Sequence, residues 1–209
     1  MLERSTRSRA SATGRSPRAP RRLSREARHE QLVAAAMPVV AERGYAGFSL
    51  DDVAAGADVT RNLLYHYFPR GRADVALAVA EAAGHQLTDE WITDESIPLA
   101  ERLIANNGRM IEHAMEPSVA WRLYRQARSS TDPELRETMD RFVEGVIAAI
   151  SLNHLGTERP PPLARAALKG YLAFFGAVLD EARAASTPPE RILPILNETL
   201  AAAMRSATS

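Results

Sequence analysis

The chain has 209 residues, of which 45% are hydrophobic, so it can bury a substantial core in one large or two small domains. It contains no cysteine, which excludes disulfides and thiolate metal sites and is compatible with a reducing cytoplasm. No apolar run approaches the roughly 20 residues of a membrane span, and the arginine-rich N-terminus lacks the apolar stretch of a signal peptide. We therefore expect a cytoplasmic protein without a membrane partner.

The formal net charge is zero, but the charges are unevenly distributed. Residues 1–72 contain 13 arginines and 7 acidic residues, whereas residues 73–209 contain 13 basic and 19 acidic residues. A basic first third joined to an acidic remainder predicts one end that binds a polyanion and one end with a different task. Residues 1–23 are mostly Arg, Ser, Ala and Pro, and we expect a disordered basic arm because they bury too little apolar surface to offset the entropy of ordering.

The first helical pattern begins at Ser24. Leu32, Ala36 and Val40 recur at spacings of four, as the core-facing side of a helix requires, and Gly44 ends the run.

Two short helices follow, separated by a tight turn. Ser49 caps the first, over Leu50–Ala57, and Thr60 caps the second, over Arg61–Phe68. This is a helix-turn-helix arrangement, in which the second short helix lies in the major groove of DNA and its first residues meet base edges. We therefore expect residues 24–72 to form a DNA-binding domain of three helices.

The sequence TRNLLYHYF, from Thr60 to Phe68, divides its side chains between a core and an outer surface. Leu64 and Phe68 are four residues apart and face inward together, because neighbouring positions on a helix point about 100° apart. We expect the outward side chains and their neighbours to contact DNA: Ser49, Thr60, Arg61, Asn62, Tyr65, His66, Tyr67 and Arg72. Arg61 and Asn62 are expected to read bases, and Tyr65 to meet a phosphate. A buried aromatic cluster and a merely solvated surface are the alternatives.

The segment from Phe48 to Val75, FSLDDVAAGADVTRNLLYHYFPRGRADV, resembles the DNA-binding segment of the TetR family of bacterial regulators. That family usually has an Asp-Ile-Ala helix, an Ala-Gly-Val-Ser turn and then Leu-Tyr-x-x-Phe. The resemblance begins at Leu32, and it implies a dimeric repressor whose C-terminal helices bind a small effector. Asp58 and Asn62 stand where the family usually has glycine.

The remainder of the chain is predicted to be helical, with prolines marking the breaks. The expected helices cover 72–91, 98–115, 118–129, 133–154, 162–185 and 190–206. No strand pattern of period two appears, so the expected fold is all-α, with residues 73–209 forming a bundle for ligand binding and dimerisation.

Polar and aromatic side chains on the middle helices are candidates for a small-molecule site. They are Asn107, Met110, His113, Trp121, Tyr124 and Phe142. Asn107 lies on an otherwise apolar stripe, where it could line a cavity or satisfy a neighbouring backbone group. The aromatic residues could equally pack the core of the bundle.

A stripe of small residues on helix 162–185 predicts a dimer interface that it shares with the last helix. The interface candidates are Ala166, Gly170, Ala173, Phe174, Ala177, Ile195 and Thr199. Small residues at spacings of four, three and four let a partner helix approach closely, and two helices from each subunit would form a two-fold four-helix interface. Such a dimer requires a near-palindromic operator. The alternative is that both helices only close the bundle of the monomer.

The sequence contains no motif of catalysis. There is no His-Glu-x-x-His, no Glu-x-x-His pair on two helices, no glycine-rich phosphate loop and no Gly-x-Ser-x-Gly elbow. We expect no enzyme activity, no cofactor and no metal. The best hypothesis is a sequence-specific transcriptional regulator, most often a repressor released by an effector. One alternative is an architectural DNA-binding protein without an effector, but the large acidic C-terminal part argues against it. The least favoured alternative is a helical-bundle enzyme.

Overall fold

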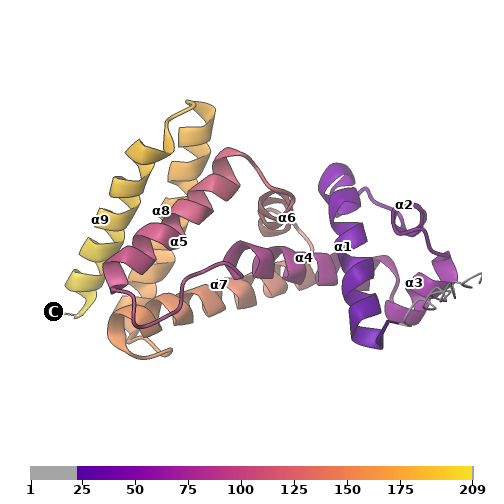
Figure 1. Ribbon diagram of the computed structural model, residues 1–209, viewed down its shortest axis with the longest axis horizontal. Helices are drawn as coiled ribbons and strands as arrows, with labels where there is room; N and C mark the ends of the chain where they lie inside the picture. The colour runs from indigo at the N-terminus through magenta and orange to yellow at the C-terminus, as the bar shows by residue number, and fades with distance from the viewer. Residues whose placement is uncertain (1–22, 209) are drawn as a thin grey trace, which may run out of the picture.

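The computed structural model describes residues 23–208, which fold into nine α-helices without a strand (Figure 1). The helices are α1 (Arg25–Arg43), α2 (Leu50–Gly56), α3 (Arg61–Tyr67), α4 (Arg72–Thr88), α5 (Leu99–Met115), α6 (Val119–Arg128), α7 (Pro133–Leu155), α8 (Pro162–Ala184) and α9 (Pro189–Thr208). The all-α prediction is confirmed. The basic arm predicted over residues 1–23 lies, apart from Leu23, outside the described residues.

Local capping explains where the helices of the N-terminal head, α1–α3, begin and end. Ser24 caps α1 by accepting a hydrogen bond from the Ala27 amide at 3.1 Å. Gly44 ends α1 with φ of 76°, a left-handed value that glycine adopts without steric cost. Asp58 has φ of 51° in the turn between α2 and α3, which the short polar side chain tolerates in place of glycine.

The end of α4 differs from the prediction. The helix stops at Thr88 instead of continuing to Trp91, because a side chain from α5 takes over the hydrogen bonds of the next backbone segment. Asn106 Oδ1 accepts from the Ile92 amide at 2.8 Å, and Asn106 Nδ2 donates to the Ile92 carbonyl at 3.2 Å. Trp91 therefore lies in the segment that joins α4 to α5.

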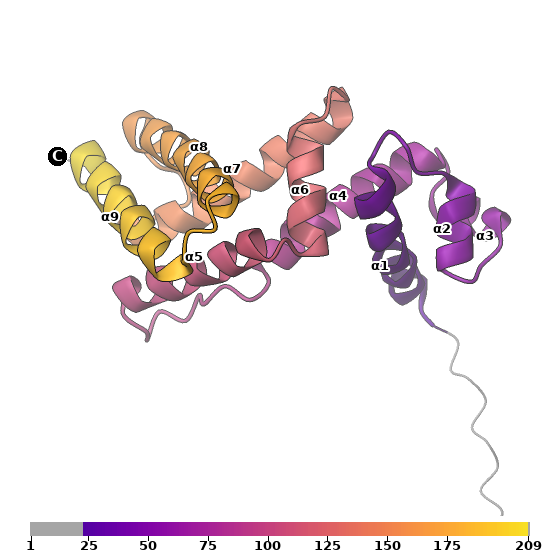
Figure 2. The ribbon, with the colours of Figure 1, turned by 90° about the horizontal axis from the view of Figure 1, so that it is seen from above.

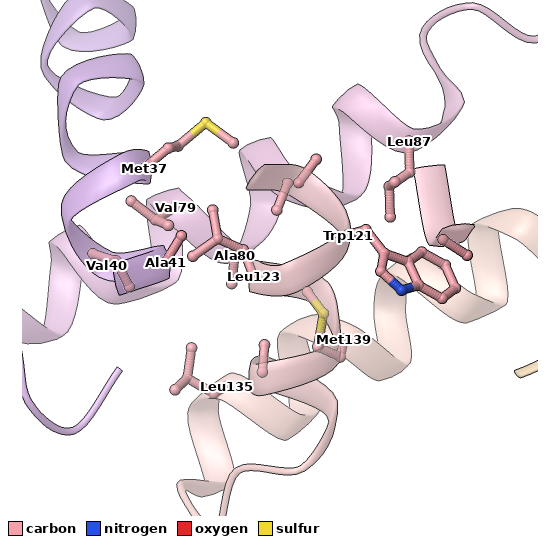
Figure 3. Close-up of a cluster of buried hydrophobic side chains, with 14 of the residues drawn as sticks. Met37, Val40, Ala41, Val79, Ala80, Leu87, Trp121, Leu123, Leu135 and Met139 are labelled. Atoms are coloured by element: carbon pink, nitrogen blue, oxygen red, sulfur yellow. The ribbon is translucent and has the colours of Figure 1, made fainter. Parts of the chain in front are cut away.

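A shared apolar core joins the head to the helical body, α4–α9. α4 packs against α1 of the head and against α6 and α7 of the body. Figure 3 shows Val40 of α1 beside Val79 and Ala80 of α4, with Leu123 of α6 and Met139 of α7 continuing the cluster. All five side chains are completely buried. The apolar core is therefore continuous from α1 through α4 to α6 and α7.

α8 and α9 lie at the end of the molecule opposite the head, where α5 packs against both (Figures 1 and 2). Contrary to the expectation from the sequence, α8 is long and apolar enough, by length and composition alone, to cross a membrane. That resemblance is weak evidence, because a helix that buries its apolar surface against protein meets the same criteria. Only 28% of its most apolar stretch is buried within one subunit.

Candidate functional site

One face of α3 is exposed and polar. Leu64 and Phe68 are buried, at 0% and 2% exposure, and hold the helix against α1 and α2. The exposed side chains on and just before the helix are Thr60, Arg61, Asn62, Tyr65 and His66. The predicted division of this segment between core and surface is confirmed, and the reading as a wholly buried aromatic cluster is wrong.

Two of the hydroxyl groups predicted to contact DNA serve as helix caps. Ser49 Oγ accepts from the Asp52 amide at 3.1 Å, and the Ser49 amide donates to Asp52 Oδ2 at 3.0 Å, so the two residues form a capping box. The hydrogen bonds from the Ser49 side chain and backbone hold the pKa of Asp52 below its usual value. Thr60 Oγ1 accepts from the Leu63 amide at 3.3 Å. These caps fix the start of α2 and of α3.

Arg61 has polar partners within the head. Its Nη1 donates to Asp51 Oδ2 at 3.0 Å, and its Nη2 donates to Tyr65 Oη at 3.4 Å. The guanidinium carbon lies 5.7 Å from the centre of the Tyr65 ring. The guanidinium is thus held on the exposed surface of α3, where half of the side chain remains accessible.

The junction between α3 and α4 is tightly built. Gly71 has φ of 63°, and a methyl group there would come within 3.0 Å of the Tyr65 ring. Arg72 Nη1 donates to the Ala46 carbonyl at 2.6 Å, and its guanidinium lies 5.7 Å from the centre of the Phe48 ring. Arg72, which was predicted to contact DNA, therefore ties α4 to the turn between α1 and α2.

The remaining aromatic residue of the segment is Tyr67, which is half-buried and packs against the core of the head. Its ring lies edge-on to the His66 ring at 5.1 Å. This places Tyr67 at the flank of the exposed face.

A cavity of about 290 Å³ lies among α5, α6, α7 and α8. Five of the six candidates for the small-molecule site line it: Asn107, Met110, Trp121, Tyr124 and Phe142. His113 does not. It lies in the last turn of α5, where its Nδ1 is 3.1 Å from Ser118 Oγ, the oxygen that also caps α6.

Three aromatic residues of the cavity wall were not predicted: Trp91, Tyr171 and Phe175. Tyr171 and Phe175 are four residues apart on α8, and their rings lie 5.9 Å apart. This spacing was visible in the sequence. Trp91 could not be found in the same way, because it lies in the connecting segment that Asn106 positions.

The polar groups of the cavity are mostly paired. Arg125 is ion-paired with Asp180, and Arg128 Nη1 donates to Asp140 Oδ1 at 3.0 Å. Asn107 Nδ2 donates to Asn197 Oδ1 on α9 at 2.6 Å, so Asn107 both lines the cavity and satisfies a neighbouring side chain.

The face predicted for dimerisation is uncovered in the single subunit. Ala166, Gly170, Ala173, Phe174 and Ala177 are all exposed along α8. On α9, Ile195 is 50% exposed and Thr199 is half-buried. Ala173 and Ala177 also line the cavity of the monomer, whereas Ala166, Gly170 and Phe174 lie outside it.

Across residues 23–208, no three histidine, aspartate or glutamate side chains come together as a metal site would require.

Similarity to known proteins extends from the head into the body. Residues 32–84, from α1 into α4, match the family model of bacterial regulatory proteins of the tetR family. The transcriptional regulator AcuR of Cereibacter sphaeroides is 34% identical over 91 residues, which cover 42% of this chain and 40% of that protein. The repressor LfrR of Mycolicibacterium smegmatis is 32% identical over 143 residues, 66% of this chain and 71% of the repressor. The chain belongs to the TetR family.

The fold agrees with this assignment. A solved TetR-family regulator from Streptomyces coelicolor superimposes with a TM-score of 0.70 at 21% identity, over 88% of this chain and 83% of that one. TetR-family proteins are DNA-binding transcriptional regulators and not enzymes. The exposed face of α3 is therefore the candidate DNA-binding surface, and the cavity is the candidate effector site.

The charge of this TetR-family head has an unexpected origin. Residues 23–72 contain six arginines and six acidic residues, so they are neutral overall. The whole excess of arginine in the first third comes from residues 1–22, with seven arginines and one acid. The basic charge from which binding to a polyanion was predicted therefore belongs to residues 1–22 and not to the head.

Proposed function

We propose that the protein is a homodimeric cytoplasmic repressor that binds a near-palindromic operator through α3 and leaves it when a small molecule fills the cavity. The observation that carries the proposal is the double position of α6. Its residues Trp121 and Tyr124 line the cavity, and two residues further on Gln126 Nε2 donates to the Ala41 carbonyl of α1 at 3.1 Å. One short helix thus lines the candidate effector site and also contacts the head.

In the DNA complex, we assign base reading to Arg61 and Asn62 at the start of α3. Tyr65, His66 and Tyr67 are assigned to phosphate oxygens, to which hydroxyl and imidazole groups donate. Arg72 joins them at the N-terminus of α4, where free backbone amides also favour an anion. Ser49 and Thr60 approach the DNA backbone while they cap their helices.

The dimer is assigned to the uncovered face of α8 and α9. Its support is the run of exposed small residues from Ala166 to Ala177, together with Phe174 and Ile195. Two copies of this face give a two-fold axis at the end opposite the heads, so both α3 helices are presented to one operator.

Effector release requires a difference in affinity between two conformations. A ligand lowers operator affinity only if it binds the conformation with displaced heads more tightly. Support for a route comes from α4, which begins directly after the recognition helix and ends beside the cavity at Thr88. A second contact is Arg70, whose Nη1 donates to Glu134 of α7 at 2.9 Å.

The proposal is tested by selecting bound sequences from random DNA duplexes with the full chain. The expected result is one near-palindromic motif, which is then used as a labelled duplex in fluorescence anisotropy while fractions of a metabolite extract are added. Recovery of no motif would support an architectural protein instead. A motif whose affinity is unchanged by every fraction would refute the effector part of the proposal.

A further inference from the structure

One aliphatic side chain of α3 has no place in the core of the head. Leu63 lies in the first turn of the helix, directly after Asn62, and it is half-buried. The half-buried apolar residues that pack against the core include Val59 before the helix and Tyr67 at its end, but not Leu63. Isolated apolar side chains are common on protein surfaces. What distinguishes Leu63 is its position on the candidate DNA-binding helix.

The position of Leu63 is fixed by the cap of α3. Its amide donates to Thr60 Oγ1 at 3.3 Å and to the Thr60 carbonyl at 3.0 Å. Successive side chains on a helix are turned by about 100°, so Leu63 points to the side of Asn62 that is opposite Arg61. It borders the exposed His66, which is three residues further on. Leu63 therefore forms an apolar edge of the polar exposed face.

The side chain of leucine neither donates nor accepts a hydrogen bond, so Leu63 has nothing to offer a phosphate. In the major groove, the base edges carry hydrogen-bond donors, acceptors and one apolar group, the C5-methyl of thymine. Contact with this methyl removes apolar surface of both partners from water. Against a cytosine–guanine pair, the same side chain would cover polar atoms without replacing their hydrogen bonds to water. Leu63 thus favours thymine and disfavours cytosine.

We propose that Leu63 is a specificity-determining residue that contacts the C5-methyl group of one thymine in each operator half-site, in the base pair next to the one that Asn62 reads. The same contact makes the protein sensitive to cytosine methylation, because 5-methylcytosine carries its methyl group at the same place in the groove. This proposal rests on the proposed function in taking α3 as the helix that enters the major groove.

The test is fluorescence anisotropy of the full chain with the motif that it selects from random duplexes. Each thymine of the motif is replaced in turn by deoxyuridine, which removes the methyl and keeps every hydrogen-bonding group. At one thymine in each half-site, the replacement should weaken the wild type by about threefold to fivefold, as expected for one lost apolar contact. In Leu63→Ala, the replacement at that position should have almost no effect. A wild type whose every thymine tolerates uracil overturns the proposal.

The methylation arm uses a cytosine at the same position, with and without its C5-methyl. The two duplexes have the same hydrogen-bonding groups, so only the methyl differs. The methylated duplex should bind the wild type about twofold to fourfold more tightly, and Leu63→Ala should bind both alike. A methyl that does not strengthen binding of the wild type contradicts the contact.

Two further variants separate this contact from other effects. Ile104→Ala makes the same kind of change at a side chain of α5 that is 48% exposed, and it should keep the full uracil effect. Leu63→Asn keeps the approximate size of the side chain and should lose the uracil effect. Equal weakening of the thymine and uracil duplexes by Leu63→Ala would indicate a contact with the sugar-phosphate backbone and refute the proposal. Loss of the fold in both Leu63 variants, measured by circular dichroism, would show a structural role and refute it as well.

Failure of this proposal differs from failure of the proposed function. A wild type that selects no motif refutes the sequence-specific regulator and the thymine contact together. A wild type that selects a motif, but whose uracil effects all survive in Leu63→Ala, remains a regulator and loses only the role assigned to Leu63.

Discussion

At the scale of single residues, Arg61 is held by an acid in the absence of DNA. Its ion pair with Asp51 lies on the exposed face of α3, where both side chains are at least half accessible, so the pair contributes little to stability. The contact matters for geometry instead. It holds the guanidinium on the exposed face of α3, between Asp51 and Tyr65.

Replacing Arg61 by Ala should weaken binding to the selected operator by about 1–3 kcal/mol and relax the preference at one base position. Tyr65→Phe should weaken all sequences to a similar extent, because a phosphate contact carries no base information. Anisotropy with the operator and with single-base variants measures both. An Arg61→Ala protein that keeps the full sequence preference would exclude Arg61 as a base reader.

Asp51→Asn should strengthen binding to operator and unrelated duplexes alike, because it removes a negative charge from the DNA-facing surface and frees Arg61. Asp58→Asn is the matched control. It removes the same charge from the neighbouring turn, where Asn also tolerates the left-handed backbone. The same change in affinity for both variants would show that general charge, and not the Arg61 contact, is responsible.

At the scale of elements, α4 and α7 meet at a glycine. A methyl group at Gly84 would come within 2.7 Å of the Phe142 ring, and Phe142 lines the cavity. The Phe142 ring of α7 can therefore pack closely on α4 only because residue 84 has no side chain. This contact lies beside the candidate effector site.

Gly84→Ala should displace the Phe142 ring and weaken effector binding. A gain of about 1 kcal/mol in helix propensity is opposed by about 1–3 kcal/mol of overpacking, so the free energy of unfolding should be unchanged or fall by up to about 2 kcal/mol. Gly108→Ala in α5 is the control, since nothing lies within 4 Å of its added methyl, and it should only stabilise. Urea unfolding and ligand calorimetry measure the two effects. A Gly84→Ala protein that behaves like Gly108→Ala would show that the contact relaxes without cost.

The sequence predicted what depends on local rules. Ser49 and Thr60 cap their helices as predicted, and the helical period of residues 60–68 separated Leu64 and Phe68 from the exposed face. The sequence patterns did not predict the contacts between helices that are far apart in the chain.

The failures share that cause. His113 was assigned to the cavity on composition, but the start of α6 brings Ser118 to it instead. Trp91 was assigned to a helix that the Asn106 side chain ends early. Ser118 lies outside the helix that carries His113, and Asn106 lies on a different helix from the one predicted to contain Trp91. Helical periodicity relates only residues of one helix, so it could not reveal these contacts.

At the scale of the whole molecule, assembly should depend on α8. Ala166→Arg together with Gly170→Glu places charges in the predicted interface and should separate the subunits while the helices remain folded, because both positions are exposed in the monomer. Light scattering beside circular dichroism measures this. Gln31→Glu with Ala34→Arg puts the same charges on exposed positions of α1 and should leave the mass unchanged. A wild type that is monomeric at micromolar concentration, or a double α8 variant that is still dimeric, would exclude this face.

Removal of residues 1–22 should weaken binding to every duplex, because it removes seven arginines from an otherwise neutral head. The slope of log affinity against log salt concentration should become shallower by about 0.9 for each phosphate that is no longer neutralised. Base preference, which is assigned to α3, should stay the same. An unchanged salt slope would mean that these arginines do not meet DNA.

The tight junction at Gly71 and Arg72 limits what an effector can do. Because Gly71 and Arg72 fasten α3 and the first turn of α4 to the rest of the head, we expect α3 to move together with the head in the proposed mechanism. Induction should then alter the distance between two heads and leave each one able to read its own half-site. The ligand-bound protein would then remain on the chromosome at scattered single half-sites. Each head would keep its base preference, but the dimer would no longer bind the two half-sites of the operator more tightly than a single half-site.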